Sequence, residues 1–142
     1  MRLLDPQTGI ETLDRNTCME LLATQEIGRL GFLSGGSPEI LPVTYALDGD
    51  AVVFATATGT KLWGATRSPV VFEVDDTDRA TRSGWSVIIH GIAEEVTDLG
   101  TPALLERVRA LHVHPWAPGE KAHLVRIAPR YMSGRRISPL QS

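Results

Sequence analysis

The sequence contains a single cysteine, Cys18, among its 142 residues. One thiol forms no disulfide within a chain and supplies no set of thiolate ligands, which excludes disulfide-stapled scaffolds and thiolate zinc modules. Long apolar runs are also missing, since no stretch approaches the ~18 consecutive apolar residues that a membrane-spanning helix requires. The N-terminal segment has one basic residue and no apolar stretch behind it, so we expect no signal peptide, no membrane partner and a cytoplasmic protein.

The net charge of the chain is small. The chain has 14 Lys and Arg against 17 Asp and Glu, a formal net charge of −3. Proteins that bind the phosphate backbone of nucleic acids present a basic face, so we expect no nucleic-acid partner. Hydrophobic residues make up 42% and charged residues 22%, a composition typical of one globular domain spanning residues 1–142.

Signatures of protein-based catalysis are absent too. The four histidines, His90, His112, His114 and His123, have no Cys or acidic partner at metal-ligand spacing, so no metal site is predicted. The chain has neither a G-x-S-x-G elbow nor a Ser-His-Asp order. The sequence therefore identifies no catalytic residue.

What the chain does contain is a series of β-branched segments with a period of two, separated by turn residues. Asp48-Gly49-Asp50 between two of them is a strong hairpin signal. The predicted strands cover residues 27–33, 39–47, 51–57, 70–74, 85–96 and 123–127, with 132–137 as a prolongation of the last one. Gly91 within a strand indicates a bulge or a close backbone neighbour. This pattern predicts a mainly β fold, an antiparallel barrel of six strands.

Few helices are expected. Thr17-x-x-Glu20 has the form of a capping box and predicts a short helix over about 17–25 that covers one end of the barrel. Helical spacing predicts a second helix over residues 102–112, and residues 62–66 fit a helical turn. The polar residues 1–16 are expected to form a loose arm, and a polar loop is expected over 75–84.

The segment from Val53 to Lys61 combines hydroxyl groups, a glycine and a lysine at the end of a predicted strand. Hydroxyl and backbone N–H donors with a nearby cation are what a phosphate group requires, although the spacing is not that of a P-loop. An ordinary Thr-rich strand that ends at a solvated lysine fits the same pattern.

Two tryptophans allow two interpretations each. Trp85 at the start of a strand either fills the barrel mouth or stacks on a flat aromatic ligand. Trp116 lies in a Pro-rich loop and either anchors that loop by packing or contacts a ligand or a second subunit. Arg29 and the Arg135-Arg136 pair fit structural ion pairs as well as anion contacts.

Taken in order, several short motifs resemble the pyridoxamine 5′-phosphate oxidase-like, FMN-binding split-barrel family, in its short actinobacterial and nitroimidazole-resistance-related branch. The resemblance covers roughly residues 13–137 and leaves 1–13 as a loose N-terminal arm. The motifs are P-V-T-Y at 42–45 with D-G at 48–49, F-A-T-A-T-G-T-K at 54–61, F-E-V-D at 72–75, G-W-S-V at 84–87, G-x-A-E at 91–94, P-W-A-P-G at 115–119 and G-R-R-I at 134–137.

The resemblance implies a Greek-key split barrel that forms a homodimer, with the cofactor between the subunits. By position it assigns the cofactor phosphate to Thr60 and Lys61 with Thr56 and Thr58 nearby, and the flavin ring to the strand Val43-Thr44-Tyr45. Ser86 stands where oxidases of the family have a glutamine, Trp85 lies beside it, and Trp116 approaches from the loop or from the partner subunit.

The chain departs from the family's oxidases in two respects. It has no Arg-x-His segment after its last tryptophan, which argues against vitamin B6 oxidation, and one lysine replaces an Arg-Lys pair at the phosphate loop. We therefore expect an FMN-dependent oxidoreductase that acts on a small molecule, with F420 or haem as alternative cofactors. A cofactor-binding module without catalysis and a barrel that has lost its ligand stay open, and the sequence does not identify the substrate.

Overall fold

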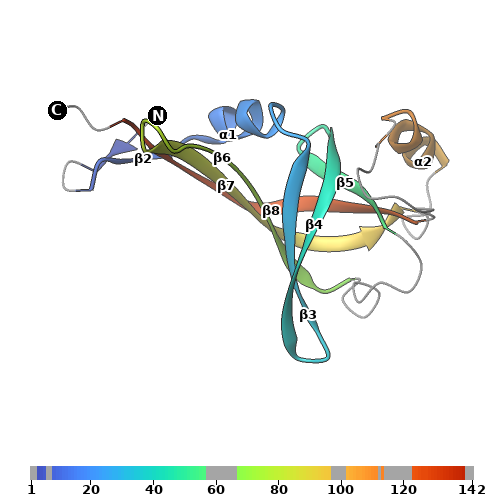
Figure 1. The fold of residues 1–142 in the computed structure, drawn as a ribbon. Coiled ribbons are helices and arrows are strands. Elements are labelled where there is room, and N and C mark those ends of the chain that lie inside the picture. Colours follow the sequence, from blue (N-terminus) through green and yellow to red (C-terminus); the bar gives the residue numbers. More distant parts are fainter. Residues whose placement is uncertain are drawn as a thin grey trace.

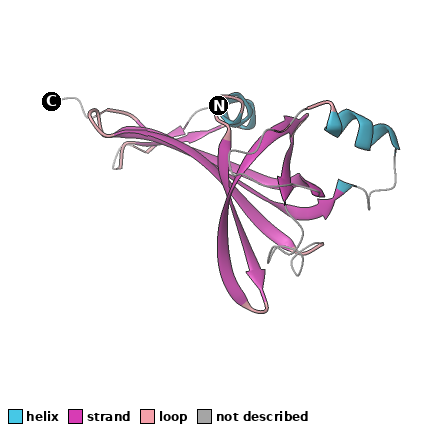
Figure 2. Cartoon of the chain, turned by 45° about the vertical axis from the view of Figure 1, so that its right-hand side comes forward, coloured by secondary structure: helices cyan, strands magenta, loops and turns pink. Residues whose placement is uncertain are grey.

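The structure, a computed structural model, describes residues 3–5, 8–56, 67–96, 102–111, 113 and 123–139. Within these ranges the chain forms eight strands and two helices (Figures 1 and 2). The strands are β1 Leu3–Leu4, β2 Ile10–Leu13, β3 Ile27–Ser34, β4 Ser37–Asp48, β5 Ala51–Thr56, β6 Pro69–Asp78, β7 Ser83–Glu95 and β8 His123–Ile137, and the helices are α1 Arg15–Leu22 and α2 Pro102–Arg109.

The barrel closes because β7 pairs with both β6 and β8. The hydrogen-bonded order is β8-β5-β4-β3-β6-β7, and β7 returns to β8. Strands β3, β4 and β5 are consecutive neighbours and β6 lies beside β3, which is the Greek-key arrangement. The predicted six-stranded antiparallel Greek-key barrel with short helices is confirmed, whereas the dimer stays a prediction.

The largest difference in strand bounds concerns the β6–β7 hairpin. The polar loop predicted over residues 75–84 is mostly strand, because Asp75–Asp78 pair in register with Ser83–Ser86. This extension has polar side chains on both faces, so its sequence lacks the alternation of apolar and polar residues that predicts a strand. The hairpin extends well beyond the barrel body, along β2 and the last residues of β8 (Figure 1).

The barrel interior is filled by side chains. Alternate residues of the strands contribute Leu30, Phe54, Phe72, Ile89 and Ile127, all fully buried. Each such side chain contributes roughly 1.5–3 kcal/mol by leaving water. A second, smaller cluster of Val53, Val96 and Val108 lies between α2 and the barrel wall. The barrel interior is therefore a core rather than a ligand cavity.

Gly91 marks an irregularity in the longest strand pairing. The β7–β8 register shifts between His90 and Gly91, as the sequence predicts. A Cβ atom at Gly91 would lie 2.4 Å from the carbonyl oxygen of Ala128, so only glycine allows the two backbones to approach this closely.

Helix α1 begins earlier than the predicted capping box. Asp14 is the N-cap, since its Oδ1 accepts a hydrogen bond of 2.8 Å from the backbone N–H of Thr17. This hydrogen bond, followed by that of the Thr17 hydroxyl, lowers the pKa of Asp14 to about 2. Thr17 itself is buried within the helix, so the prediction that it caps a helix over 17–25 is wrong.

The N-terminal segment is not the loose arm that we expected over residues 1–13. Residues 10–13 form β2 and pair with Gly134–Ile137 of β8, and β1 pairs with β2. The partner strand lies more than 120 residues away along the chain, so local composition gives no sign of this pairing.

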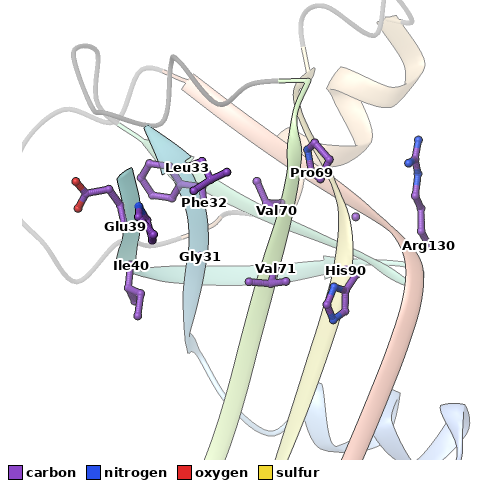
Figure 3. A pocket seen from close by; sticks show the side chains of 12 residues that line it. Gly31, Phe32, Leu33, Glu39, Ile40, Pro69, Val70, Val71, His90 and Arg130 are labelled. Atoms are coloured by element: carbon purple, nitrogen blue, oxygen red, sulfur yellow. The ribbon is translucent and has the colours of Figure 1, made fainter. Parts of the chain in front are cut away.

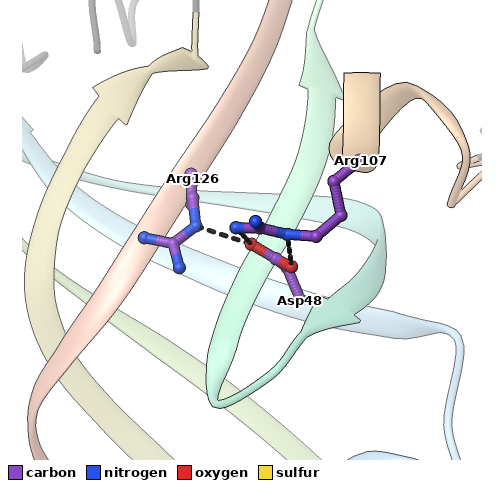
Figure 4. A network of polar contacts seen from close by, with 3 residues as sticks. All are labelled: Asp48, Arg107 and Arg126. Atoms are coloured by element: carbon purple, nitrogen blue, oxygen red, sulfur yellow. Dashed lines mark hydrogen bonds and ion pairs between the residues drawn. The ribbon is translucent and has the colours of Figure 1, made fainter. Parts of the chain in front are cut away.

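Helix α2 confirms the predicted second helix and is attached by a buried carboxylate. Arg107 donates to Asp48 from Nε (2.8 Å) and Nη2 (3.1 Å), and Arg126 of β8 donates from Nε to Oδ2 at 3.0 Å (Figure 4). The hydrogen bonds from Arg107, and then the one from Arg126, lower the pKa of Asp48 against its burial. One carboxylate thus joins α2, β4 and β8.

Within the described ranges, neither helix has the length and apolar character of a membrane span.

Candidate functional site

The side chains of β3, β4, β6 and β7 that alternate away from the core form what we call the outer face. Cross-strand register aligns its members in rows across the strands. The outer face comprises Arg29, Gly31 and Leu33 of β3, Ile40 and Thr44 of β4, Val71, Glu73 and Asp75 of β6, and Ser86, Ile88 and His90 of β7.

The predicted flavin-facing segment of β4 is divided between the two faces. Thr44 belongs to the outer face, whereas Val43 and Tyr45 are buried among the core residues. The Tyr45 hydroxyl donates to the carbonyl oxygen of Leu22 at the end of α1, and its ring packs edge-on against Phe72 with centroids 5.3 Å apart. Burial raises the pKa of Tyr45. The Tyr45 side chain therefore connects α1 to the barrel.

Thr56 is the last described residue of β5 and begins the Thr-rich segment. Its side chain is 3% exposed, and its Oγ1 atom has no hydrogen-bond partner among the residues that the structure describes. A buried hydroxyl without a partner costs about 1–3 kcal/mol, so such an atom calls for a partner beyond the described residues. Thr58, Thr60 and Lys61, the remaining predicted phosphate contacts, lie outside the described residues.

A histidine–carboxylate pair that sequence spacing does not reveal lies next to Thr56. His123 of β8 is the cross-strand partner of Thr56, and its Nδ1 lies 2.6 Å from Oε1 of Glu95 on β7. A carboxylate only accepts hydrogen bonds, so this contact places a proton on Nδ1 and fixes the orientation of the ring. The two partners are 28 residues apart in the chain and meet only because β7 pairs with β8.

Trp85 and Ser86 lie on opposite faces of β7. Trp85 packs against the main core cluster, whereas Ser86 belongs to the outer face and is the cross-strand partner of Asp75 and Arg135. The Trp85 side chain is half-buried, and its contact with a ligand stays a prediction. Trp116 lies outside the described residues.

Both residues nevertheless contribute to a groove of about 300 Å³ between the β6–β7 hairpin and β8, which we call the hairpin groove. Its polar lining consists of Asp75, Thr77, Arg82, Ser83, Ser86 and Arg135.

Beside the hairpin groove, Arg29 bridges two carboxylates. Its Nη1 atom lies 3.1 Å from Oε1 of Glu73 and 3.3 Å from Oδ1 of Asp75. Burial, and then the neighbouring Asp75, raise the pKa of Glu73 to about 7. Glu73 is therefore an ionisable group with a raised pKa on the outer face, one that the sequence motifs do not indicate.

A larger and mostly apolar groove of about 540 Å³ crosses the other part of the outer face. Its walls include Leu33, Ile40, Val71 and His90, and Glu39 and Arg130 lie on opposite sides of it (Figure 3). Leu33 and Ile40 are 60% and 74% exposed, which is unusual for side chains of this size and clusters here.

No group of three or more His, Cys, Asp or Glu side chains able to hold a metal ion occurs in the part of the chain that the structure describes.

The fold is a small antiparallel split barrel with two grooves along its outer face. The family model described as pyridoxamine 5′-phosphate oxidase matches residues 14–136, and the chain belongs to that family. The Mycobacterium tuberculosis protein Rv0080 is 35% identical over 96% of this chain and 92% of its own length.

Two solved structures are similar as well. The FAD binding protein from Mycobacterium smegmatis has a TM-score of 0.76 and 31% identity, covering 89% of this chain and 97% of its own. A protein from Corynebacterium diphtheriae has a TM-score of 0.75 and 32% identity, covering 96% of this chain and 100% of its own.

Proposed function

We propose that the protein binds a flavin and works as a flavin-dependent oxidoreductase on a small molecule. The family match and the similarity to an FAD-binding protein support this proposal. The observation that carries it is the buried Oγ1 atom of Thr56, which lacks a partner within the described ranges at the point where the Thr-rich segment begins. A bound flavin supplies hydride and electron transfer, so the protein itself needs no nucleophile.

The residues present fit a flavin. Thr56 supplies a hydroxyl, Thr58, Thr60 and Lys61 follow in the sequence as phosphate contacts, and Thr44 and Ser86 offer hydroxyl groups on the outer face. Backbone groups of Val43 and Tyr45 are proposed to border the ring, with Trp85 and Trp116 as its further neighbours. FMN is the proposed cofactor, with FAD, F420 and haem as alternatives; an absorbance spectrum separates the flavins from F420 and from haem, and chromatography of the released cofactor separates FMN from FAD.

Thr56→Val tests this assignment, because the exchange is isosteric. Since Oγ1 has no partner among the described residues, the apo variant should keep the urea midpoint of the wild type. Its Kd for FMN, followed by quenching of flavin fluorescence, should rise by about threefold to tenfold, the loss of one hydrogen bond. Lys61→Ala should weaken binding further. An unchanged Kd in Thr56→Val contradicts the assignment, and a colourless protein that quenches no FMN fluorescence contradicts flavin binding.

Turnover separates an enzyme from a storage or sensing module. Protein saturated with flavin is mixed with NAD(P)H or reduced F420 and with a quinone or nitro compound as acceptor, and oxidation of the donor is followed by absorbance. Multiple turnovers per flavin are expected. Stoichiometric binding without turnover would show that the chain is a binding module.

We further propose that the apolar groove of the outer face is covered by a second copy of this chain, so that the cofactor lies between two subunits. Glu39 and Arg130 line opposite sides of the groove, so a two-fold axis brings Glu39 of one copy to Arg130 of the other. The exposed apolar side chains Leu33, Ile40 and Val71 lie between them. The charge pair and the apolar centre together favour a symmetric interface.

Ile40→Glu tests the interface, and Leu4→Glu is the matched control. Both replace an exposed aliphatic side chain, 74% and 63% exposed, but Leu4 lies on β1 outside the groove. Light scattering after size exclusion should show a dimer for the wild type and Leu4→Glu and a monomer for Ile40→Glu. A monomeric wild type, or an equal effect of both substitutions, contradicts the interface.

A further inference from the structure

The hairpin groove carries two guanidinium groups that the proposed phosphate site does not use. Arg82 lies in the turn between β6 and β7, and Arg135 lies on β8 directly across from Ser86. Neither has a carboxylate within ion-pair distance among the described residues. By contrast, Arg29, Arg107 and Arg126 each lie within about 3.3 Å of one.

The turn that carries Arg82 is held by its own polar contacts. Asp78 Oδ1 accepts hydrogen bonds from the backbone N–H groups of Ala80 (2.9 Å) and Thr81 (3.3 Å), and the hydroxyl groups of Thr81 and Ser83 lie 2.6 Å apart. Arg82 adopts a left-handed backbone conformation with φ of 53°. These contacts hold the backbone of Arg82 at the edge of the groove.

The remaining lining supports the two cations. Thr77, Ser83 and Ser86 add hydroxyl donors, and Ile10 and Ile137 add apolar walls that strengthen polar interactions nearby. Asp75 also lines the groove, but its carboxylate lies 3.3 Å from Arg29, which offsets its charge. In a chain of net charge −3, this groove concentrates positive charge locally.

We propose that the hairpin groove binds an anionic group, a phosphate or a carboxylate, held by the guanidinium groups of Arg135 and Arg82 and by the hydroxyl groups of the groove. The planar fork of arginine matches these oxyanions with two parallel hydrogen bonds. Ser86 lines this groove and also belongs to the proposed flavin site. That the anion lies beside the cofactor therefore rests on the proposed function. The anion comes either from the tail of a dinucleotide cofactor such as FAD or from the substrate.

Inorganic pyrophosphate is the probe, titrated by calorimetry into the full chain with and without bound FMN. Arg135→Gln should raise the Kd for pyrophosphate about tenfold or more, since hydrogen bonds between charged groups contribute about 1.5–3 kcal/mol. Arg82→Gln should raise it severalfold. Arg79→Gln is the matched control, because Arg79 is an exposed arginine of the same turn that does not line the groove. Urea midpoints establish that all variants are folded.

The two sources of the anion give different results with FAD. If the groove holds the cofactor tail, FAD binds more tightly than FMN, Arg135→Gln removes that preference, and pyrophosphate competes with FAD. If it holds the substrate, pyrophosphate binds equally well to the FAD-loaded protein and Arg135→Gln leaves the FAD-to-FMN ratio unchanged. Either result supports the groove as an anion site.

Failure of the inference and failure of the proposed function are distinguishable. If no flavin binds but pyrophosphate still depends on Arg135 and Arg82, the flavin proposal fails and the anion site stands. If wild type and Arg135→Gln have the same affinity for pyrophosphate, if wild type binds none, or if Arg79→Gln weakens binding as much as Arg82→Gln, the inference is overturned.

Discussion

Gly134 shows how closely single residues fit where α1 packs on β8. A Cβ atom at this position would lie 2.5 Å from Sγ of Cys18 and 3.3 Å from Leu13. Gly134→Ala should therefore lower the free energy of unfolding by about 1–3 kcal/mol, the range for overpacked cores.

Cys18→Ala provides the test of that cause, because alanine has no Sγ atom to clash with the new methyl group. In a double-mutant cycle measured by urea unfolding, the double variant should lose less stability than the sum of the single variants. Strict additivity would show that the cost of Gly134→Ala arises elsewhere.

The sequence predicts which residues of the candidate site are polar better than it predicts which of them meet. Motif order selects Thr56 and Ser86, and the structure places Thr56 Oγ1 in a buried position without a partner among the described residues and Ser86 in the hairpin groove. The motif treats Val43, Thr44 and Tyr45 as one ring-facing segment, but successive strand residues point to opposite faces, so Thr44 lies on the outer face and Tyr45 in the core. The partners Glu95 of His123 and Arg135 of Ser86 depend on strand pairing across the barrel, which no local pattern contains.

Among the elements, α2 depends on the carboxylate of Asp48, which is 7% exposed and receives hydrogen bonds from two arginines. Asp48→Asn leaves both guanidinium groups without their anion and should cost about 1.5–3 kcal/mol, the range for hydrogen bonds to charged groups. Urea unfolding followed by circular dichroism measures the loss.

Asp50→Asn is the control for Asp48→Asn. Asp50 belongs to the same hairpin and lies 2.8 Å from Arg15, but both side chains are more than half exposed. Exposed ion pairs contribute about 0–1 kcal/mol, so this variant should resemble the wild type. Equal losses in the two variants would contradict the structural role of Asp48.

Element prediction succeeded where one face of an element is buried and failed where it is not. Strands β3, β6 and β7 alternate between core and surface, whereas β5 is buried on both faces, and these patterns are sufficient to predict the fold class. The outer part of the β6–β7 hairpin has polar side chains on both faces, and β2 is only four residues long. Such strands form because a partner is present, so their own sequences do not reveal them.

At the scale of the whole molecule, the filled barrel determines where ligands can bind. The interior is occupied by side chains such as Phe54 and Phe72, and the hairpin groove and the apolar groove both lie outside it. Both grooves border the outer face, which the proposed second copy would cover.

That outer face also makes the stability of the folded chain depend on pH through Glu73. Its pKa is raised from 4.5 to about 7 by burial and by Asp75, so the folded chain holds a proton that the unfolded chain releases. The stabilising contribution is complete below pH 4.5 and is lost as the pH rises through 7.

Glu73→Gln has no titrating group at this position. As the pH rises from 4.5 through 7, the wild type should therefore lose stability relative to this variant. Arg29→Gln removes the guanidinium that lowers this pKa and should extend the interval above pH 7. Urea midpoints at a series of pH values measure both effects, and parallel pH profiles for wild type and Glu73→Gln would refute the assignment.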